Sequence, residues 1–176
     1  MANALTLITH HSSLVTAFIA LGSNLDDPEQ QIRNGIRELA ALPETRLVSS
    51  SALYRSAPVG YRDQPDFVNA VACIETKLKP RALLDRLLAI ERCHGRMRGF
   101  PNAPRTLDLD IALYADLTLR EPGLTIPHPR MHERAFVIVP LAEIAPEASI
   151  PGRGSVADVL RNVDAAGVVK LAGVST

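Results

Sequence analysis

Apolar residues along the chain form patterns of two kinds: short continuous runs, and repeats at helical spacing. Val15–Leu21 is a short apolar run that ends at Gly22, which predicts a buried strand. Asp27 and Pro28 follow. An Asp N-cap before a Pro at the first helical position predicts a helix, and the apolar residues after it recur at helical spacing over 28–41.

Further runs of the same two kinds predict the rest of the secondary structure. They indicate strands over 47–54, 67–75 and 106–114, a helix from Pro80 to Gly95, helices near 131–142 and 155–162, and loops over 55–65 and 96–104. The first six elements follow in the order strand, helix, strand, strand, helix, strand. That order predicts an α+β fold, in which helices pack on a ferredoxin-like antiparallel sheet to form an αβα sandwich.

Composition indicates one globular unit. The chain has 176 residues, 47% of them apolar, and no repeat or linker divides it, so we expect a single domain over 14–176 after a loose leader over 1–13. The 19 basic residues balance the 19 acidic ones, which argues against nucleic acid or a membrane as a partner. Two cysteines do not make a disulfide framework, so we expect a cytoplasmic protein, and we expect a monomer.

Two acids, Asp108 and Asp110, lie two positions apart in the predicted strand 106–114 and therefore share one face. The alternating residues are apolar and should face the core: Leu107, Leu109, Ile111 and Leu113. The two carboxylates lie about 7 Å apart at Cα and repel each other unless a cation lies between them. Mg²⁺ suits such a pair, because it binds a few carboxylates together with water and phosphate oxygens. By itself, the pattern also suits a solvated strand face.

Arginines gather around the loop that precedes these acids. Arg96, Arg98 and Arg105 bracket the loop, and a guanidinium can bind two phosphate oxygens at once. Beside Mg²⁺ they would form a triphosphate site under a mobile loop that closes over ATP. Each arginine taken alone suits a surface ion pair equally well.

One histidine lies in a rigid setting. Pro127 and Pro129 flank His128 and hold its backbone extended. His128 is therefore either a hydrogen-bond donor to a phosphate or a structural histidine in a turn.

Phe67 and Asn69 share a face of the predicted strand 67–75. An aromatic ring beside an amide suits a flat heterocycle, because the ring stacks while the amide reads the edge. Phe136 would supply the opposite wall, and backbone groups of 56–60 would reach the same ring. Core packing is the alternative for either phenylalanine.

Four stretches occur in an order and at a spacing that resemble a known family. They are Ala20–Leu25, Asp63–Ala70, Pro104–Ile111 and Pro127–Pro129. Together they resemble 6-hydroxymethyl-7,8-dihydropterin pyrophosphokinase of folate biosynthesis over roughly residues 15–147, and the run P-R-T-L-D-L-D-I is far more specific than a bare D-x-D. The resemblance implies transfer of a diphosphate from ATP to the hydroxymethyl group of a reduced pterin, which yields AMP and the pterin diphosphate.

The resemblance also implies roles for individual residues. Asp108 and Asp110 would hold two Mg²⁺ ions, and Arg96 and Arg105 would act with them as catalytic residues on the phosphates. The ATP-binding positions would be Glu91, Arg98, Ile111, Thr125, His128 and Arg134. The pterin-binding positions would be Gly22, Ser56, Ala57, Val59, Phe67, Asn69 and Phe136, with the two phenylalanines on opposite faces of the ring.

The chain departs from the family in one loop. The family pattern R-W-G-P-R is replaced here by Pro101–Arg105, so the covering Trp and the Arg before it are absent, and the loop is about one residue shorter. Phe100 lies at a different offset from that Trp. Two alternatives therefore stay open: a paralog that uses a different hydroxymethyl pterin, and a pterin- or nucleotide-binding protein with weakened catalysis.

Overall fold

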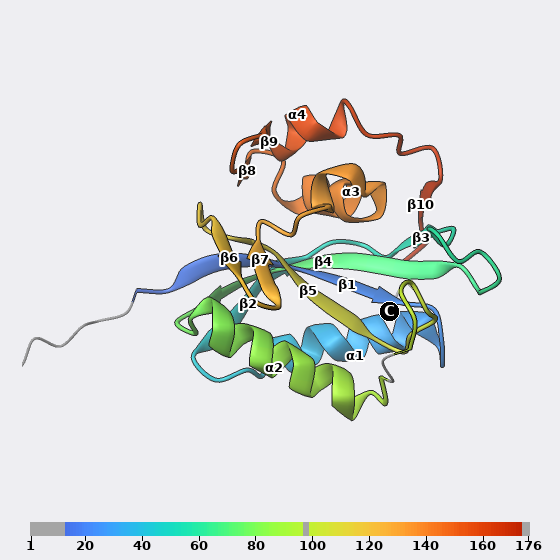
Figure 1. Ribbon diagram of the computed structural model, residues 1–176, viewed down its shortest axis with the longest axis horizontal. Helices are drawn as coiled ribbons and strands as arrows, with labels where there is room; N and C mark the ends of the chain where they lie inside the picture. Colours follow the sequence, from blue (N-terminus) through green and yellow to red (C-terminus); the bar gives the residue numbers. More distant parts are fainter. Residues whose placement is uncertain (1–12, 97–98, 174–176) are drawn as a thin grey trace, which may run out of the picture.

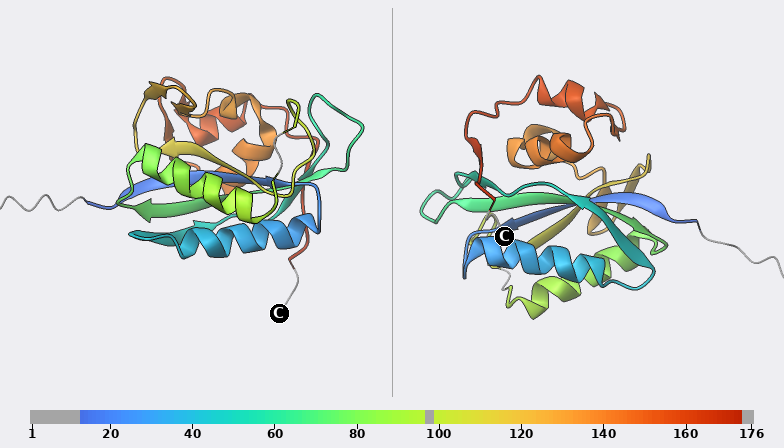
Figure 2. Two further views of the ribbon diagram at one scale, coloured as in Figure 1. Left: turned by 60° about the horizontal axis from the view of Figure 1, so that its bottom comes forward. Right: turned by 180° about the vertical axis from the view of Figure 1, so that it is seen from behind.

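The chain folds into a β-sheet that lies between two helical layers. The computed structural model describes residues 13–96 and 99–173. One face of the sheet is covered by α1 (Pro28–Ala40) and α2 (Pro80–Cys93), and the other by α3 (Ala135–Ile144) and α4 (Val156–Leu160) (Figure 1). Figure 2 shows the same three layers from two further directions. The predicted αβα sandwich is therefore confirmed.

The central sheet has six strands, which in chain order are β1 (Val15–Ser23), β2 (Thr45–Ser50), β3 (Tyr54–Ser56), β4 (Phe67–Thr76), β5 (Asp108–Tyr114) and β10 (Val168–Lys170). Their spatial order is β10-β3-β4-β1-β5, with β2 also paired to β4, and every pairing is antiparallel. This is the ferredoxin-like order that the sequence predicts, extended by β10 at one edge. The smaller elements are the hairpin of β6 (Leu119–Glu121) with β7 (Leu124–Ile126), the hairpin of β8 (Ser149–Ile150) with β9 (Gly154–Ser155), and the 3-10 turn η1 (Met131–Glu133).

Local chemistry fixes the ends of the two large helices as the sequence predicts. Asp27 is the N-cap of α1, and its side chain accepts a hydrogen bond from the backbone N–H of Gln30 at 3.4 Å. Helix α2 ends before Gly95, which adopts φ 70°. Gly35 lets α1 approach the sheet, because a Cβ there would lie 3.2 Å from side-chain atoms of Leu21 and Leu107.

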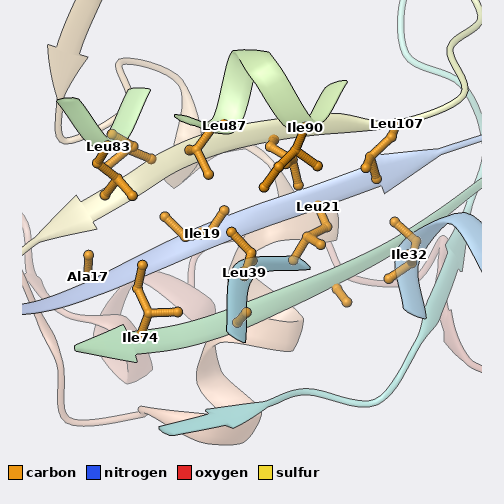
Figure 3. Packing of buried hydrophobic residues seen from close by; sticks show 14 of the residues in the cluster. Ala17, Ile19, Leu21, Ile32, Leu39, Ile74, Leu83, Leu87, Ile90 and Leu107 are labelled. Atoms are coloured by element: carbon orange, nitrogen blue, oxygen red, sulfur yellow. The ribbon is translucent and has the colours of Figure 1, made fainter. Parts of the chain in front are cut away.

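The larger hydrophobic cluster lies between the sheet and the helices α1 and α2 (Figure 3). From α2 it receives Leu83, Leu87 and Ile90 at helical spacing. The sheet meets them with alternate residues of its strands, including Ile19 of β1, and Leu107, just before β5, joins the same cluster. A second cluster, formed around Ile138 and Leu141 of α3, lies on the opposite face.

Two expectations about the strands are wrong in detail. The single strand predicted over 47–54 is split into β2 and β3, because the Ser51 hydroxyl accepts the backbone N–H of Val71 and interrupts the ladder. Leu113 was expected on the same face as Leu109, but the register between β1 and β5 shifts by one residue next to it, so its side chain joins the second cluster.

The N-terminal leader and membrane-spanning helices were two further questions raised by the sequence. Residues 1–12 lie outside the described residues, as does most of the expected leader. Within 13–96 and 99–173, no helix is both long and apolar enough to cross a membrane.

Candidate active site

A pocket of about 370 Å³ opens on the α3 side of the sheet. Its floor includes Asn69, Gly22 and Asp108, which lie side by side on β4, β1 and β5 because they are register partners. Neighbouring strands are spaced by about 4.8 Å, so Asn69 and Asp108 are separated by roughly 10 Å at the backbone. The site for a flat ring and the carboxylate pair are thus two ends of one pocket.

Polar groups at the β3 and β4 end are held in fixed orientations. The Asn69 side chain donates from Nδ2 to the hydroxyl of Ser56 at 2.9 Å and to the carbonyl of Tyr54 at 3.4 Å. Its oxygen Oδ1 lies beside Gly22, where an added Cβ would come within 3.5 Å. Because Nδ2 is already engaged, Asn69 presents a hydrogen-bond acceptor to whatever binds there.

Two aromatic rings line the same pocket, and an arginine lies over each. The guanidinium carbon of Arg105 is 5.3 Å from the centre of the Phe67 ring, and that of Arg134 is 5.7 Å from the centre of the Phe136 ring. Both distances are within the range of cation–π attraction. The rings come from β4 and α3, so the fold brings together two aromatics that are far apart in the sequence.

Arginines and acids form a network at the β5 end. Arg96 contacts the carboxylates of Glu91 and Asp108 through the same nitrogen, Nη1, and Arg105 donates to the other oxygen of Asp108 at 2.6 Å. Glu91 is almost fully buried, and it accepts the backbone N–H of Leu109 at 2.8 Å. Burial raises the pKa of Glu91, and its contacts tie the end of α2 to the start of β5.

Asp110 is the acid whose charge is most disfavoured. Burial within the fold, together with the charges of Asp108 and Glu91, raises the pKa of Asp110 to about 7, although nearby Arg134 and Arg96 act in the opposite direction. The side chain still has 42% of its surface exposed, because it opens onto the pocket. A bound cation would relieve this repulsion, so the pair suits a divalent metal ion electrostatically.

His128 lies beside this acid in its neutral form. Burial and the charge of Arg134 lower the pKa of His128 to about 4. Its Nδ1 accepts the backbone N–H of Arg130 at 3.3 Å, so the proton belongs on Nε2, which lies 4.0 Å from Oδ2 of Asp110. His128 is therefore positioned as a hydrogen-bond donor at the edge of the carboxylate pair.

A second pocket, of about 480 Å³, lies on the α2 side. It shares four residues with the first pocket: Asn102, Arg105, Asp108 and Asp110. The carboxylates therefore stand at the boundary between two spaces, one lined by aromatic rings and one lined by the loop after α2. Two substrates placed in these spaces would meet at the acids.

Most of the residues implicated by the sequence are brought together here. The first pocket is lined by Gly22, Ser56, Ala57, Val59, Phe67, Asn69, Arg105, Asp108, Asp110, Arg134 and Phe136, and the second adds Glu91 and Arg96. Thr125 and His128 line neither pocket: His128 lies beside Asp110, whereas Thr125 lies on β7, where it pairs with Arg120 of β6. The Ile111 side chain lies in the core, opposite to the carboxylates, so only its backbone is available to a ligand. Arg98 lies outside the described residues.

Asn24 has a structural role in the site that sequence reasoning missed. Its amide donates to Gln64 Oε1 at 2.9 Å and to the Pro65 carbonyl at 3.0 Å, and its oxygen accepts the backbone N–H of Arg105 at 2.9 Å. It therefore joins the loop after β3 to the loop before β5. Asn24 lies in the Ala20–Leu25 stretch that carries part of the family resemblance, but nothing local indicates its partners.

Arg130 and Val168 also line the first pocket, although the sequence analysis does not predict them. Of these two, only Arg130 had a sequence signal, because it lies two residues after His128.

The loop that departs from the family pattern contacts the loop after β3. Phe100 packs edge to face against Tyr61 with their ring centres 5.1 Å apart, and Phe100 remains 55% exposed. Gln64 donates from Nε2 to the backbone carbonyl of Asn102 at 2.9 Å. The aromatic of this loop is therefore placed beside the second pocket rather than over the first.

Protein side chains alone do not complete a metal site. Within 13–96 and 99–173, no group of three or more His, Cys, Asp or Glu side chains is arranged to hold a metal ion. Two carboxylates are nevertheless a sufficient protein contribution for Mg²⁺ when phosphate oxygens and water supply the remaining ligands. The residues present therefore fit Mg²⁺ bound together with a nucleotide.

Comparisons with known proteins agree with this geometry. Residues 18–146 match the family described as 7,8-dihydro-6-hydroxymethylpterin-pyrophosphokinase (HPPK). The chain is 46% identical to the 2-amino-4-hydroxy-6-hydroxymethyldihydropteridine pyrophosphokinase of Haemophilus influenzae, over 90% of this chain and 99% of that protein, and 46% identical to the protein of the same name from Pseudomonas aeruginosa, over 89% and 96%. Among solved structures, the wild-type HPPK-DHPS of Plasmodium falciparum has a similar fold, with a TM-score of 0.67 and 13% identity over 85% of this chain and 44% of that chain.

Proposed function

The chain belongs to the 7,8-dihydro-6-hydroxymethylpterin-pyrophosphokinase family, and from this premise we propose how its own residues perform the reaction. The enzyme transfers a diphosphate from ATP to the hydroxymethyl group of 6-hydroxymethyl-7,8-dihydropterin in folate biosynthesis, which leaves AMP and the pterin diphosphate. The observation that carries the proposal is the register row of Asn69, Gly22 and Asp108, because it sets a ring-binding pocket beside the carboxylates.

The pterin binds between Phe67 and Phe136 in the first pocket. The amide of Asn69, with Ser56 behind it, reads the polar edge of the ring, and Gly22 leaves room for that edge to approach. The loop residues Ala57 and Val59 close the same side. This orientation points the hydroxymethyl group along the row toward Asp108.

ATP lies across the boundary between the two pockets, with its phosphates near Asp108 and Asp110. These carboxylates would hold two Mg²⁺ ions, which when bound would neutralise negative charge on the triphosphate. Glu91 fixes the start of β5 from within the protein, and it shares Arg96 with Asp108. The remaining nucleotide contacts come from Arg98, Thr125, Arg134 and the backbone at Ile111.

Catalysis consists of positioning and charge stabilisation. The pterin hydroxyl oxygen attacks the β-phosphorus in line and gives its proton to Asp108. The bond from that phosphorus to the oxygen bridging it to the α-phosphate breaks, so AMP leaves. The guanidinium groups of Arg96 and Arg105 donate hydrogen bonds to the phosphate oxygens as negative charge develops there. His128, neutral and protonated on Nε2, donates to a phosphate oxygen without adding positive charge.

Domain extent, oligomeric state and cellular compartment are part of the same proposal. We infer that residues 14–176 act as a single pyrophosphokinase domain and that the protein works as a cytoplasmic monomer. Cys93 is an exposed free thiol and Cys73 a buried one, which suits a reducing compartment.

The proposal is tested by AMP release from hydroxymethyldihydropterin, ATP and Mg²⁺. Asp110→Ala should abolish measurable AMP release, which means a rate lower by about 10³-fold or more, while the protein keeps its fold. Asp116→Ala, which alters an exposed acid just after β5, is the matched control and should leave the rate unchanged. Normal turnover by Asp110→Ala with Mg²⁺ would rule out the metal assignment.

The altered loop supports one second candidate for the substrate. Phe100 packs on Tyr61 instead of covering the pterin pocket. The open side of that pocket would therefore leave room for a hydroxymethyl pterin with a different substituent. A comparison of kcat/KM across several hydroxymethyl pterins distinguishes a paralog with a changed preference from the family's usual substrate choice. Calorimetry that shows ligand binding without AMP release would instead indicate weakened catalysis.

A further inference from the structure

The C-terminal segment of the chain returns to the substrate pocket. Residues 147–176 lie beyond the family match, which covers 18–146. After α4 the chain passes the end of α3 and adds β10 to the edge of the sheet, beside β3 (Figures 1 and 2). On this path Asp164, Gly167 and Val168 line the first pocket.

Strand register determines which β10 side chain faces the pocket. Val168 is the register partner of Ser56, and Ser56 is the partner of Phe67, so these three side chains form one row on the same face. Ser56 and Phe67 both line the pocket, and Val168 continues that wall across the edge strand. The next residue, Val169, points to the opposite face and is 48% exposed.

The segment is fastened to the fold just after Val168. Towards the C-terminus, Lys170 donates to Glu143 of α3 at 2.8 Å, and the backbone N–H of Leu171 donates to the carbonyl of Leu53 at 2.8 Å. Together with the pairing of β10 to β3, these two contacts hold the segment against the sheet rather than leaving it as a free tail. Before β10, the carboxylate of Asp164 accepts the backbone N–H of Ala166 at 3.1 Å, which shapes a local turn within the segment.

We propose that 164–168 forms a wall of the pterin site and that Val168 is a specificity-determining residue for the heterocycle. Its side chain is aliphatic and offers no hydrogen bond, so it accepts an apolar edge or a small alkyl substituent and excludes a bulky or polar one. This inference rests on the proposed pterin site, and it assigns a role to a part of the chain that the family match does not include.

The test compares two substitutions on neighbouring residues of the same strand. Val168→Phe should raise the KM for hydroxymethyldihydropterin by about tenfold or more, because the ring fills pocket space, while the KM for ATP stays within about twofold. Val169→Phe adds the same ring to the opposite face and should leave both values unchanged. Phe and Val both favour strands, so neither change should disrupt β10. Equal effects of the two substitutions on the pterin KM would overturn the proposal.

A smaller change keeps the proposal testable if Val168→Phe fails to fold. Val168→Ala, with thermal denaturation as a check, should raise the pterin KM by roughly three- to tenfold through lost apolar contact, again with little change in the KM for ATP. An unchanged pterin KM in a folded Val168→Ala protein would also overturn it. Failure of the proposed function is distinguishable, because the wild-type protein would then release no AMP at all.

Discussion

Arg105 donates a hydrogen bond from Nη1 to Oδ2 of Asp108, three residues further along the chain, at 2.6 Å. The same guanidinium lies over the Phe67 ring. One side chain thus spans the two ends of the pocket, the aromatic end and the carboxylate end. Substrates that bind at both ends of the pocket displace Arg105 from Asp108 and from the Phe67 ring. The guanidinium group is then free to bind phosphate oxygens.

Arg105→Lys is expected to lower kcat by about 10²-fold, because an ammonium cannot bind two phosphate oxygens in one plane. The KM values should change less, since charge is retained. Arg161→Lys, an exposed arginine paired with Asp158 on α4, serves as the control. Steady-state kinetics measure the effect, and a kcat close to that of the wild type would show that bidentate binding by Arg105 is not used.

The raised pKa of Asp110 predicts how the stability of the metal-free protein depends on pH. In the folded state the pKa is about 7, against an ordinary value of 3.8, so the folded protein holds this proton more tightly than the unfolded chain does. The contribution of Asp110 to the free energy of unfolding is therefore greatest below pH 4 and falls as the pH rises to about 7. Asp110→Asn should remove this part of the pH dependence.

Thermal denaturation in EDTA from pH 5 to pH 8 measures it. The Tm advantage of Asp110→Asn over the wild type should grow with pH, and added Mg²⁺ with an ATP analogue should reverse it for the wild type only. A Tm difference that is independent of pH would contradict the assigned pKa.

Glu143 is predicted to stabilise the join between α3, β3 and β10. Its carboxylate accepts hydrogen bonds from Lys170, from the Tyr54 hydroxyl at 2.9 Å and from the Ala52 backbone N–H at 3.0 Å. Burial alone would raise the pKa of Glu143, but these bonds outweigh it and hold the pKa below its usual value. Burial and Glu143 together raise the pKa of Tyr54 to about 12.

Glu143→Gln should therefore lower the free energy of unfolding by about 1–3 kcal/mol at pH 7 in urea denaturation. Since the folded-state pKa is lowered, this stabilisation is present above pH ~4.5 and is lost as the pH falls through the folded-state value. Glu121→Gln, in an exposed pair with Arg81, should cost no more than about 1 kcal/mol. Equal losses for the two variants would show that the three bonds add nothing.

Asn24→Ala is predicted to impair both stability and turnover. The substitution leaves the backbone N–H of Arg105 without its acceptor and separates the loops on either side of the pocket, so we expect about 1–3 kcal/mol of destabilisation. The loss of kcat should exceed that of Asn34→Ala, which changes a half-buried asparagine of α1 that accepts a hydrogen bond from Gln30 at the surface. If both variants keep wild-type kcat at a temperature where they are folded, Asn24 does not position Arg105.

Local patterns in the sequence were enough to predict the sandwich and the carboxylate pair. Apolar spacing and helix caps depend on residues within a few positions, which is why α1, α2 and β5 were predicted with nearly their observed bounds. Alternation also placed Asp108 and Asp110 on one face. The break after β2 was missed because it depends on the hydrogen bond from Val71 to Ser51, a partner 20 residues away.

Tertiary structure decided what those residues meet. The sequence indicated arginines near the acids, but only packing placed Arg96 between Glu91 and Asp108, Asn24 between two loops, and Val168 beside Ser56. The physical reason is that these contacts join segments from different elements, and their geometry follows from strand register and helix packing rather than from spacing along the chain. Local chemistry thus determined the elements and the kind of site, whereas the order of strands across the sheet determined the shape of the pocket.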